Sequence, residues 1–212
     1  MRHIKWVKLL FFMFLVKPLV FIGLGLNLVN RQKLPQRGPA ILAANHTSHL
    51  DTLVLMSLYP LSALHKVRPV AAADYFLKNK WLAWFSHQCL DIIPIDRQGK
   101  LPREQLLEGC YQALERDQII IFFPEGTRSL TETRDFHLKR GIHALVQKYP
   151  QTYVAPIMLR GLGKALPKGE GLLVPFNCDV IIGDKLAYAD NSNHYIATLK
   201  KTYEHLQKYN IH

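Results

Sequence analysis

Residues 119–123, Ile-Ile-Ile-Phe-Phe, form an uninterrupted apolar run. Successive residues of a strand point to opposite faces of its sheet, so a strand of this composition needs cover on both faces. Strands buried on both faces are typical of parallel sheets that lie between layers of helices. The run therefore predicts an α/β fold with a buried central sheet.

The rest of the chain alternates short apolar segments with longer segments of helical periodicity. Strands are predicted at residues 40–44, 67–73, 92–95, 119–123 and 153–159 and within 172–182, and helices at 50–58, 75–90, 102–116, 138–148 and 193–209. This alternation predicts a central, mostly parallel sheet flanked by helices. We expect one domain over residues 31–212, preceded by a helical membrane-associating segment over residues 1–30.

The chain is basic, with 27 Lys and Arg against 16 Asp and Glu and a net charge of +11. Seven of these basic residues precede Asp51, which is the first acidic residue. A nucleic-acid-binding arm would be polar between its basic residues, whereas here they bracket two apolar runs, residues 9–16 and 19–29. The pattern favours an anionic phospholipid membrane and argues against nucleic acid.

Residues 1–16 imitate a secretory signal, but no Ala-x-Ala-like site follows, so we do not expect cleavage. A helix over residues 9–29 would rise about 31 Å, barely the thickness of a hydrocarbon core. Lys17-Pro18 interrupts it. We therefore expect a bent helical pair within one leaflet, anchored by Trp6 and flanking basic residues, on the cytoplasmic face of the plasma (inner) membrane. A true span and an internal core helix are the alternatives.

Three cysteines, Cys89, Cys110 and Cys178, lie far apart without CxxC or CxxH spacing. Neither a zinc site nor a disulfide framework is indicated. We expect reduced core residues, no metal site, and a folded part that faces the cytoplasm.

The segment Asn-His-Thr-Ser-His-Leu-Asp, residues 45–51, joins a predicted strand to a predicted helix. On one continuous helix His46 and Asp51 would point about 140° apart. With His46 in a loop and Asp51 in the first helical turns, the carboxylate can hold one imidazole nitrogen and leave the other as a base. The alternative is that Thr47 or Ser48 only caps the helix while the histidines are solvated.

A second polar segment, Phe-Pro-Glu-Gly-Thr-Arg-Ser, begins as the 119–123 strand ends. Such a turn places Glu125 and Arg128 at the rim of the sheet, where α/β proteins bind ligands, and an arginine there suits a phosphate. Arg97 ends another predicted strand, and Lys139 precedes a helix. Each of these cations could equally be a solvated surface charge.

In this order, NHTSHLD, IPIDRQG, FPEGTRS, LKRG and VAPI (residues 154–157) resemble the four-block pattern of the glycerolipid acyltransferase family, the PlsC-like 1-acyl-sn-glycerol-3-phosphate acyltransferases. His46 and Asp51 match the His-x4-Asp block, and Arg97 matches the arginine that ends the second block. The third block is matched by Glu125, Gly126, Thr127 and Arg128. The fourth is looser, and the resemblance covers residues 38–182.

The resemblance implies transfer of a fatty acyl group from acyl-CoA or acyl-ACP, as co-substrate, to the sn-2 hydroxyl of lysophosphatidate, with no metal or redox cofactor. It implies that His46 is the general base and that Asp51 orients it. Residues implied for the glycerol phosphate are Arg97, Glu125, Gly126, Thr127 and Arg128, with Lys139 as an addition.

Three alternatives stay open from the sequence. The acceptor could be another lyso-lipid, such as a lysophospholipid with a larger head group or a lyso-ornithine lipid. The protein could bind membrane lipid without turnover. A covalent acyl-enzyme could form on Ser48 or Cys110, although the chain has no Gly-x-Ser-x-Gly elbow.

Overall fold

The computed structural model describes residues 5–76, 79–96, 102–128, 135–165 and 178–209. Within these ranges seven strands form one sheet in the order β1-β7-β6-β2-β5-β3-β4. They are β1 (Asn27–Val29), β2 (Ala40–Ala44), β3 (Val67–Ala72), β4 (Ile93–Ile95), β5 (Ile119–Phe122), β6 (Tyr153–Arg160) and β7 (Asp179–Ile182). Neighbours pair in parallel except β6 and β7. The predicted mostly parallel central sheet is confirmed.

The apolar run at 119–123 supplies β5, which lies between β2 and β3 in the middle of the sheet. Ile119 and Ile121 belong to the core on one face, and Ile120 and Phe122 to the core on the other. β2 alternates in the same way. Both faces are therefore covered, as a wholly apolar strand requires.

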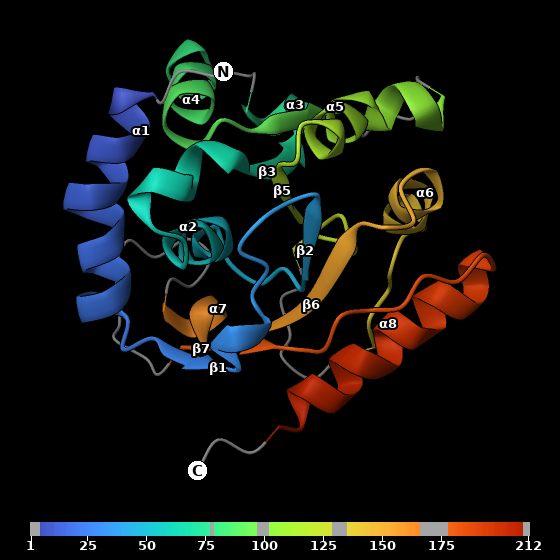
Figure 1. The fold of residues 1–212 in the computed structure, drawn as a ribbon. Coiled ribbons are helices and arrows are strands. Elements are labelled where there is room, and N and C mark those ends of the chain that lie inside the picture. The colour runs from blue at the N-terminus through green and yellow to red at the C-terminus, as the bar shows by residue number, and fades with distance from the viewer. Residues whose placement is uncertain (1–4, 77–78, 97–101, 129–134, 166–177, 210–212) are drawn as a thin grey trace.

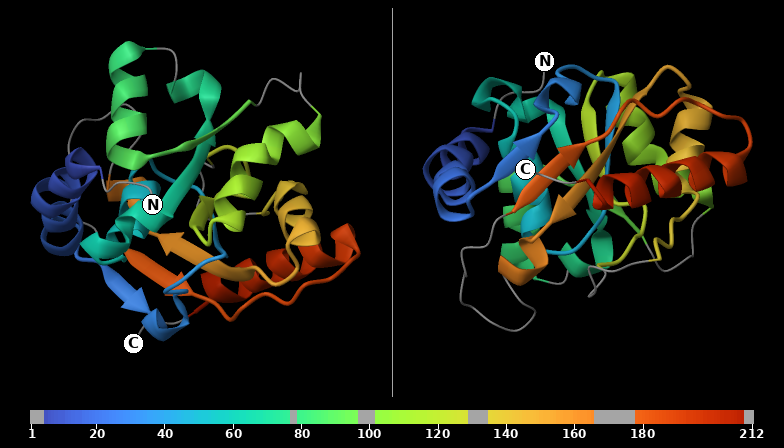
Figure 2. Two further views of the ribbon diagram at one scale, coloured as in Figure 1. Left: turned by 45° about the horizontal axis from the view of Figure 1, so that its top comes forward. Right: turned by 90° about the horizontal axis from the view of Figure 1, so that it is seen from below.

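Helices form a layer on each face of the sheet (Figures 1 and 2). One core contains the inner side of the N-terminal helix and α2 (Leu50–Ser57), and the other contains α5 (Arg103–Glu115), α6 (Gly141–Lys148) and α8 (Ser192–Gln207). The remaining elements are α3 (Ala73–Phe76), α4 (Lys80–Phe85), the π-helical turn η5 (Ser86–Leu90), α7 (Leu162–Ala165), and short 3-10 turns at Arg31–Lys33 (η3) and Leu61–Lys66 (η4).

The single helix predicted at 75–90 differs from the structure. Asn79 caps a separate helix, because its side chain accepts a hydrogen bond from the Trp81 N–H. From there α4 and η5 continue to Leu90. Residues 77–78, and residues 172–177 of another predicted strand region, lie outside the described residues.

The expected bend at Lys17-Pro18 is wrong. Residues 6–23 form one continuous helix, from α1 (Trp6–Phe11) through the π-helical turns η1 (Phe12–Val16) and η2 (Leu19–Gly23), at the left of Figure 1. Pro18 has φ −57° and ψ −45°, which its ring already favours. Wider turns on both sides, such as the bond from the Lys17 N–H to the Phe12 carbonyl, accommodate its missing donor.

The lysines of this helix do not face outward, contrary to their expected role as membrane anchors. Lys8, only 3% exposed, donates to the carbonyls of Val67 and Leu90 at 3.0 and 3.3 Å. Lys17 donates to the Ser57 carbonyl at 2.9 Å. Lys5 lies 3.2 Å from the Asp91 carboxylate. These three ammonium groups therefore attach the helix to the domain.

The inner stripe of the helix joins the core of the domain. Phe12, Val16, Val20 and Leu24, at four-residue spacing, are buried together with residues of α2. Residues 27–29 then form β1, an edge strand of the sheet. By length and composition residues 6–23 are apolar enough to cross a membrane, and about a fifth of them are buried against the domain. The segment is thus continuous with the fold while keeping an apolar outer face.

Gly38 occupies a position that excludes any side chain. A Cβ there would overlap the backbone of Asp117 and Gln118, which lead into β5. We predict that Gly38→Ala lowers the free energy of unfolding by about 2 kcal/mol or more in urea denaturation. Gly163→Ala is the matched control, because a Cβ there makes ordinary contact at 3.7 Å with Thr47. Equal stability of the two variants would contradict this packing.

All three cysteines are buried and unpaired, as expected. Burial raises the pKa of each thiol, to about 12 for Cys110 and about 11 for Cys178. A raised pKa keeps a thiol protonated at neutral pH, and only the thiolate is a strong nucleophile. We predict that a maleimide at pH 7.5 leaves the native protein unlabelled and labels three thiols in concentrated urea, as counted by mass spectrometry. Rapid labelling of the native chain would refute this.

Candidate active site

The two motif-bearing loops meet at one edge of the sheet. β2 and β5 are parallel neighbours, with Ala43 opposite Phe122, so their carboxyl ends lie side by side. The chain reaches His46 two residues after β2 and Glu125 three residues after β5. This is the edge at which open α/β sheets bind ligands.

His46 and Asp51 form the predicted pair. The His46 Nδ1 lies 2.8 Å from the Asp51 Oδ2, with His46 in the loop and Asp51 in the first turn of α2. The carboxylate is fully buried, and the imidazole side chain is 17% exposed. A carboxylate at Nδ1 selects the tautomer with its proton there, which leaves Nε2 as the basic nitrogen.

The same carboxylate organises the loop around it. Asp51 Oδ2 also accepts from the backbone N–H groups of Thr47 and Ser48 at 2.6 and 2.9 Å, and Oδ1 accepts from the Thr47 hydroxyl at 3.2 Å. These bonds compensate for removing the charge from water. The Ser48 hydroxyl in turn accepts from the Leu50 N–H at 3.2 Å. The N-cap residue of α2 is His49 and no side chain caps this helix, so the alternative of a cap by Thr47 or Ser48 is not what the structure shows.

The loop after β5 holds His46 from the other side. The Phe123 ring stacks on the imidazole with a centroid distance of 4.1 Å and an interplanar angle of 20°. Glu125 Oε1 accepts from the His46 backbone N–H at 3.1 Å. Both the ring plane and the backbone of His46 are therefore fixed by residues that follow β5.

Lys139 lies across the turn that follows Glu125. Gly126 has φ +75°, and a Cβ there would come within 2.9–3.1 Å of the end of the Lys139 side chain. The Lys139 backbone N–H donates to the Pro124 carbonyl at 2.8 Å. A glycine is thus required by both the backbone angle and the approach of the lysine. The structure brings Lys139 to the third block.

Arg128 and Thr127 are exposed at the outer side of this loop. Arg128 acts on His49: burial, then the Arg128 guanidinium and the His46 imidazole, lower the pKa of His49, against an opposing effect of Asp51. His49 is consequently neutral at pH 7, and Arg128 is within electrostatic reach of the first block. Arg97, the predicted arginine of the second block, lies outside the described residues.

Sequence reasoning did not single out two residues that build this site. The Asn45 side chain, 2% exposed, accepts from the Leu159 N–H at 2.6 Å and donates to the Leu159 carbonyl at 3.0 Å, which ties the end of β2 to β6. Phe123 supplies the stacking face for His46. The sequence signals that could have pointed to them are the position of Asn45 directly before His46 and the position of an aromatic residue directly after β5.

The two candidate nucleophiles for a covalent route are poorly placed. Ser48 is 3% exposed, and its hydroxyl is engaged with Leu50. Cys110 is fully buried on the inner side of α5, and burial raises its pKa. The partner of the His46 Nδ1 is Asp51. The geometry supports direct base catalysis over an acyl-enzyme on either residue.

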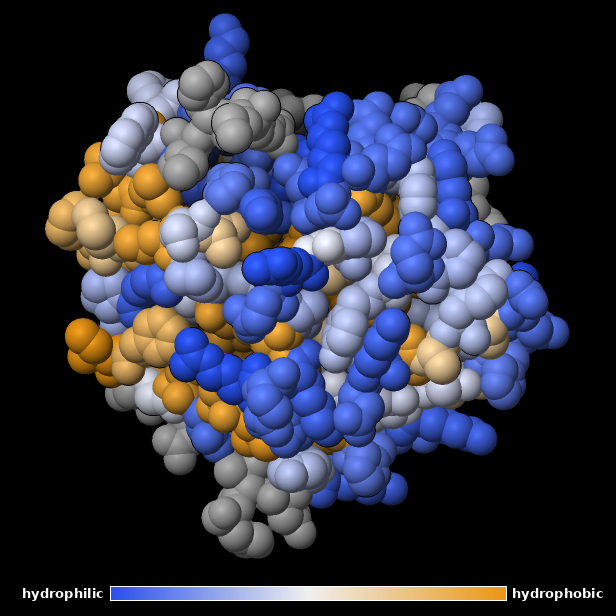
Figure 3. Space-filling view, in the orientation of Figure 1, coloured by the Kyte–Doolittle hydropathy of each residue, from blue (hydrophilic) through white to orange (hydrophobic). Residues whose placement is uncertain are grey.

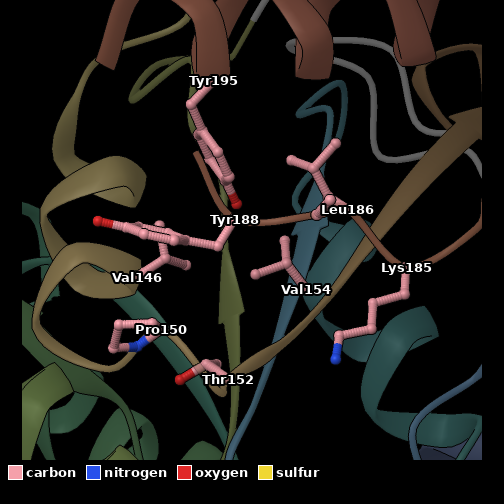
Figure 4. Close-up of a pocket in the computed structure, with 9 residues that line it drawn as sticks. Val146, Pro150, Thr152, Val154, Lys185, Leu186, Tyr188 and Tyr195 are labelled. Carbon is pink, nitrogen blue, oxygen red and sulfur yellow. The ribbon is translucent and has the colours of Figure 1, made fainter. Parts of the chain in front are cut away.

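A hollow in the surface lies away from this edge. It is bounded by α6, the start of β6, residues 185–188 and α8 (Figure 4). Val154 in its wall pairs with Ile41, near the amino end of β2, so the hollow is at the opposite edge of the sheet from His46. In Figure 4 the hydroxyl of Tyr188 points away from Lys185. None of the predicted site residues that the structure describes lines it.

Comparison with known proteins agrees with this geometry. A chloroplastic 1-acyl-sn-glycerol-3-phosphate acyltransferase of Arabidopsis thaliana is 30% identical over 74% of this chain, and the match spans only 42% of that protein. The 1-acyl-sn-glycerol-3-phosphate acyltransferase of Bacillus subtilis is 24% identical over 82% of this chain and 80% of its own length. Among the other relatives is a taffazin of Dictyostelium discoideum, 29% identical over 72% of this chain and 56% of its own length.

Among solved structures, the fold resembles that of PlsC, the 1-acyl-sn-glycerophosphate acyltransferase of Thermotoga maritima. The TM-score is 0.72 at 18% identity, over all of this chain and 86% of that one. The family model named Acyltransferase matches residues 25–160, which contain β2, β5, β6 and both motif loops. The chain therefore belongs to the acyltransferase family.

Proposed function

We propose that the protein transfers a fatty acyl group from acyl-CoA or acyl-ACP to the sn-2 hydroxyl of 1-acyl-sn-glycerol-3-phosphate, producing phosphatidic acid. One observation carries the proposal: an imidazole oriented by a buried carboxylate stands on a loop beside a second loop bearing Arg128 and Lys139. A base next to cations suits an acceptor that has both a hydroxyl and a phosphate. The names of the Arabidopsis and Bacillus relatives support this choice of acceptor.

In the proposed reaction His46 Nε2 removes the proton of the acceptor hydroxyl. The hydroxyl oxygen forms a bond to the thioester carbonyl carbon, and the carbon–sulfur bond breaks as the tetrahedral intermediate collapses. The imidazolium then returns its proton to the leaving thiolate. Asp51 stabilises the imidazolium and keeps the ring in place, without itself becoming protonated.

The oxyanion needs hydrogen-bond donors that are not already engaged. Amides of the first block are committed, since Thr47 and Ser48 donate to Asp51 and His46 donates to Glu125. We therefore assign oxyanion stabilisation to backbone amides of the third block, beyond Gly126. Glu125 braces the two loops by accepting from the His46 N–H. In this scheme it also serves the glycerol part of the acceptor, while the phosphate goes to the cations.

The phosphate of the acceptor is assigned to Arg128 and Lys139, with Arg97 as a third cation from the second block. Arginine can grip a phosphate with two hydrogen bonds, and lysine adds a point charge. Gly126 lets Lys139 approach the turn, and Thr127 offers a hydroxyl beside Arg128. No metal or redox cofactor enters this scheme.

Membrane association belongs to the same proposal, because the acceptor and the product are lipids. The helix over residues 6–23 is held along one side of the domain by Lys5, Lys8 and Lys17. A crossing helix would have to withdraw these contacts. We therefore propose monotopic binding at the cytoplasmic face of the plasma (inner) membrane, with the apolar outer side of the helix in one leaflet.

The base assignment is tested by His46→Ala. Loss of a positioned general base is expected to lower kcat about 1,000-fold with lysophosphatidate and acyl-CoA or acyl-ACP. His194→Ala, at an exposed histidine of α8, is the control and should keep full activity. Vesicle binding should be the same for both variants. Substantial activity of His46→Ala would remove His46 from the base role.

The phosphate assignment is tested by Arg128→Ala. Loss of a charge-assisted hydrogen bond of about 1.5–3 kcal/mol predicts a rise of about 10- to 100-fold in the KM for lysophosphatidate. Arg116→Ala, at an exposed arginine before β5 on the opposite edge of the sheet, is the matched control. A rise confined to the KM of the thioester would assign Arg128 to the donor.

The acceptor itself is tested with purified wild-type protein. Lysophosphatidate should be acylated faster than lysophospholipids with larger head groups and lyso-ornithine lipid, with acyl-CoA and acyl-ACP each tried as donor. Preference for another lyso-lipid would overturn the proposed substrate while leaving the chemistry intact. Absence of turnover with every pair would favour a lipid-binding role.

A further inference from the structure

All three tryptophans of the chain are exposed. Trp6 is 75% exposed, Trp81 77% and Trp84 52%. Tryptophan is a large apolar side chain that is highly buried on average in folded proteins. Exposure of every tryptophan in a 212-residue chain therefore needs an explanation other than core packing.

The three tryptophans lie on elements that pack against each other. The rings of Phe11 in α1 and Phe85 in α4 meet edge to face with a centroid distance of 5.2 Å. Lys5, directly before Trp6, donates to the His87 carbonyl in η5. Figure 1 draws α4 beside the amino end of the N-terminal helix, and Figure 2 agrees.

Exposed large apolar side chains concentrate on these two elements. Among the described residues they are Trp6, Val7, Leu10, Met13, Phe14, Leu15, Phe21 and Ile22 on the N-terminal helix and Trp81 and Trp84 on α4, with Tyr209 elsewhere. Figure 3 shows apolar residues gathered along the left edge, where Figure 1 places the helix. Contiguous apolar surface of this kind marks an interaction site.

The direction of the lysines makes this surface suited to lipid. Lys8 and Lys17 donate inward to backbone carbonyls, and Lys5 faces Asp91 and His87. The outer side of residues 6–23 is therefore left apolar. Tryptophan is enriched at membrane interfaces, where its ring reaches the acyl chains while its N–H stays near the polar head groups.

We propose that Trp81 and Trp84 of α4 form a second membrane contact beside the N-terminal helix. The inference rests on the membrane association proposed above and extends it to an element inside the catalytic domain, between β3 and β4. A lone helix lying in a leaflet leaves the domain free to rotate about the helix axis. A second contact on α4 removes that freedom and sets the tilt of the domain on the bilayer.

The proposal is tested by tryptophan fluorescence in the full-length protein. Trp6→Phe retains only the tryptophans of α4, and the double variant Trp81→Phe/Trp84→Phe retains only Trp6. Each is bound to phosphatidylglycerol–phosphatidylcholine vesicles whose acyl chains carry bromine. We expect quenching in both variants. Quenching of Trp6 alone in bound protein would overturn the contact through α4.

A second pair of variants separates this contact from the reaction. Trp81→Glu/Trp84→Glu should weaken partition onto vesicles at least tenfold, and Tyr209→Glu, an exposed apolar position on neither element, should not. Acylation of a short-chain acceptor dispersed in water should be unchanged in both, with circular dichroism confirming the fold. Equal partition of the two variants would refute the proposal.

A protein partner or a second copy is the competing occupant of this surface. Dimerisation of the wild-type protein in gel filtration, together with unquenched α4 tryptophans in Trp6→Phe on brominated vesicles, would assign the surface to a copy of the chain and overturn the lipid contact. Failure of acyl transfer with quenching intact would overturn the proposed function and leave this contact standing.

Discussion

The site depends on the burial of one carboxylate. Asp51 has no exposed surface, and a buried charge is stable only when its lone pairs are engaged. Its partners are the His46 ring and the amides of Thr47 and Ser48, so the carboxylate is stabilised only while the loop keeps its shape. The same bonds that compensate for desolvation therefore hold the imidazole ready for proton transfer.

That arrangement is held by one helical layer and by two strands of the sheet. Asp51 belongs to α2, which packs in one core with Phe12 and Val16 of the N-terminal helix. Asn45 ties the loop to β6, and Phe123 and Glu125 hold it from the end of β5. Rigid placement of His46 reduces the reorganisation needed during proton transfer. The cations Arg128 and Lys139 lie farther along the loop that follows β5.

Much of this architecture was predictable because it depends on local patterns. The apolar run of β5 required a strand covered on both faces, and strands that alternate with helices imply a parallel sheet whose carboxyl ends share an edge. That edge brings the His46 and Glu125 loops together. The brace from Asn45 to Leu159 was not predictable, because it joins residues 114 positions apart through side-chain-to-backbone bonds that leave no periodic signal.

The N-terminal segment was misread for a related reason. Hydropathy treats Lys17 as a charge facing lipid, but its ammonium reaches the Ser57 carbonyl, a contact that only the tertiary fold provides. Lys5, Lys8 and Lys17, which we expected to attract anionic lipid, thus bond to the domain instead. In the proposed membrane contact, affinity then rests more on apolar area, which salt does not screen, than on the surface charge of this segment. The N-terminal helix and the sheet domain are accordingly one folded unit, since Lys5, Lys8 and Lys17 each bond to the domain.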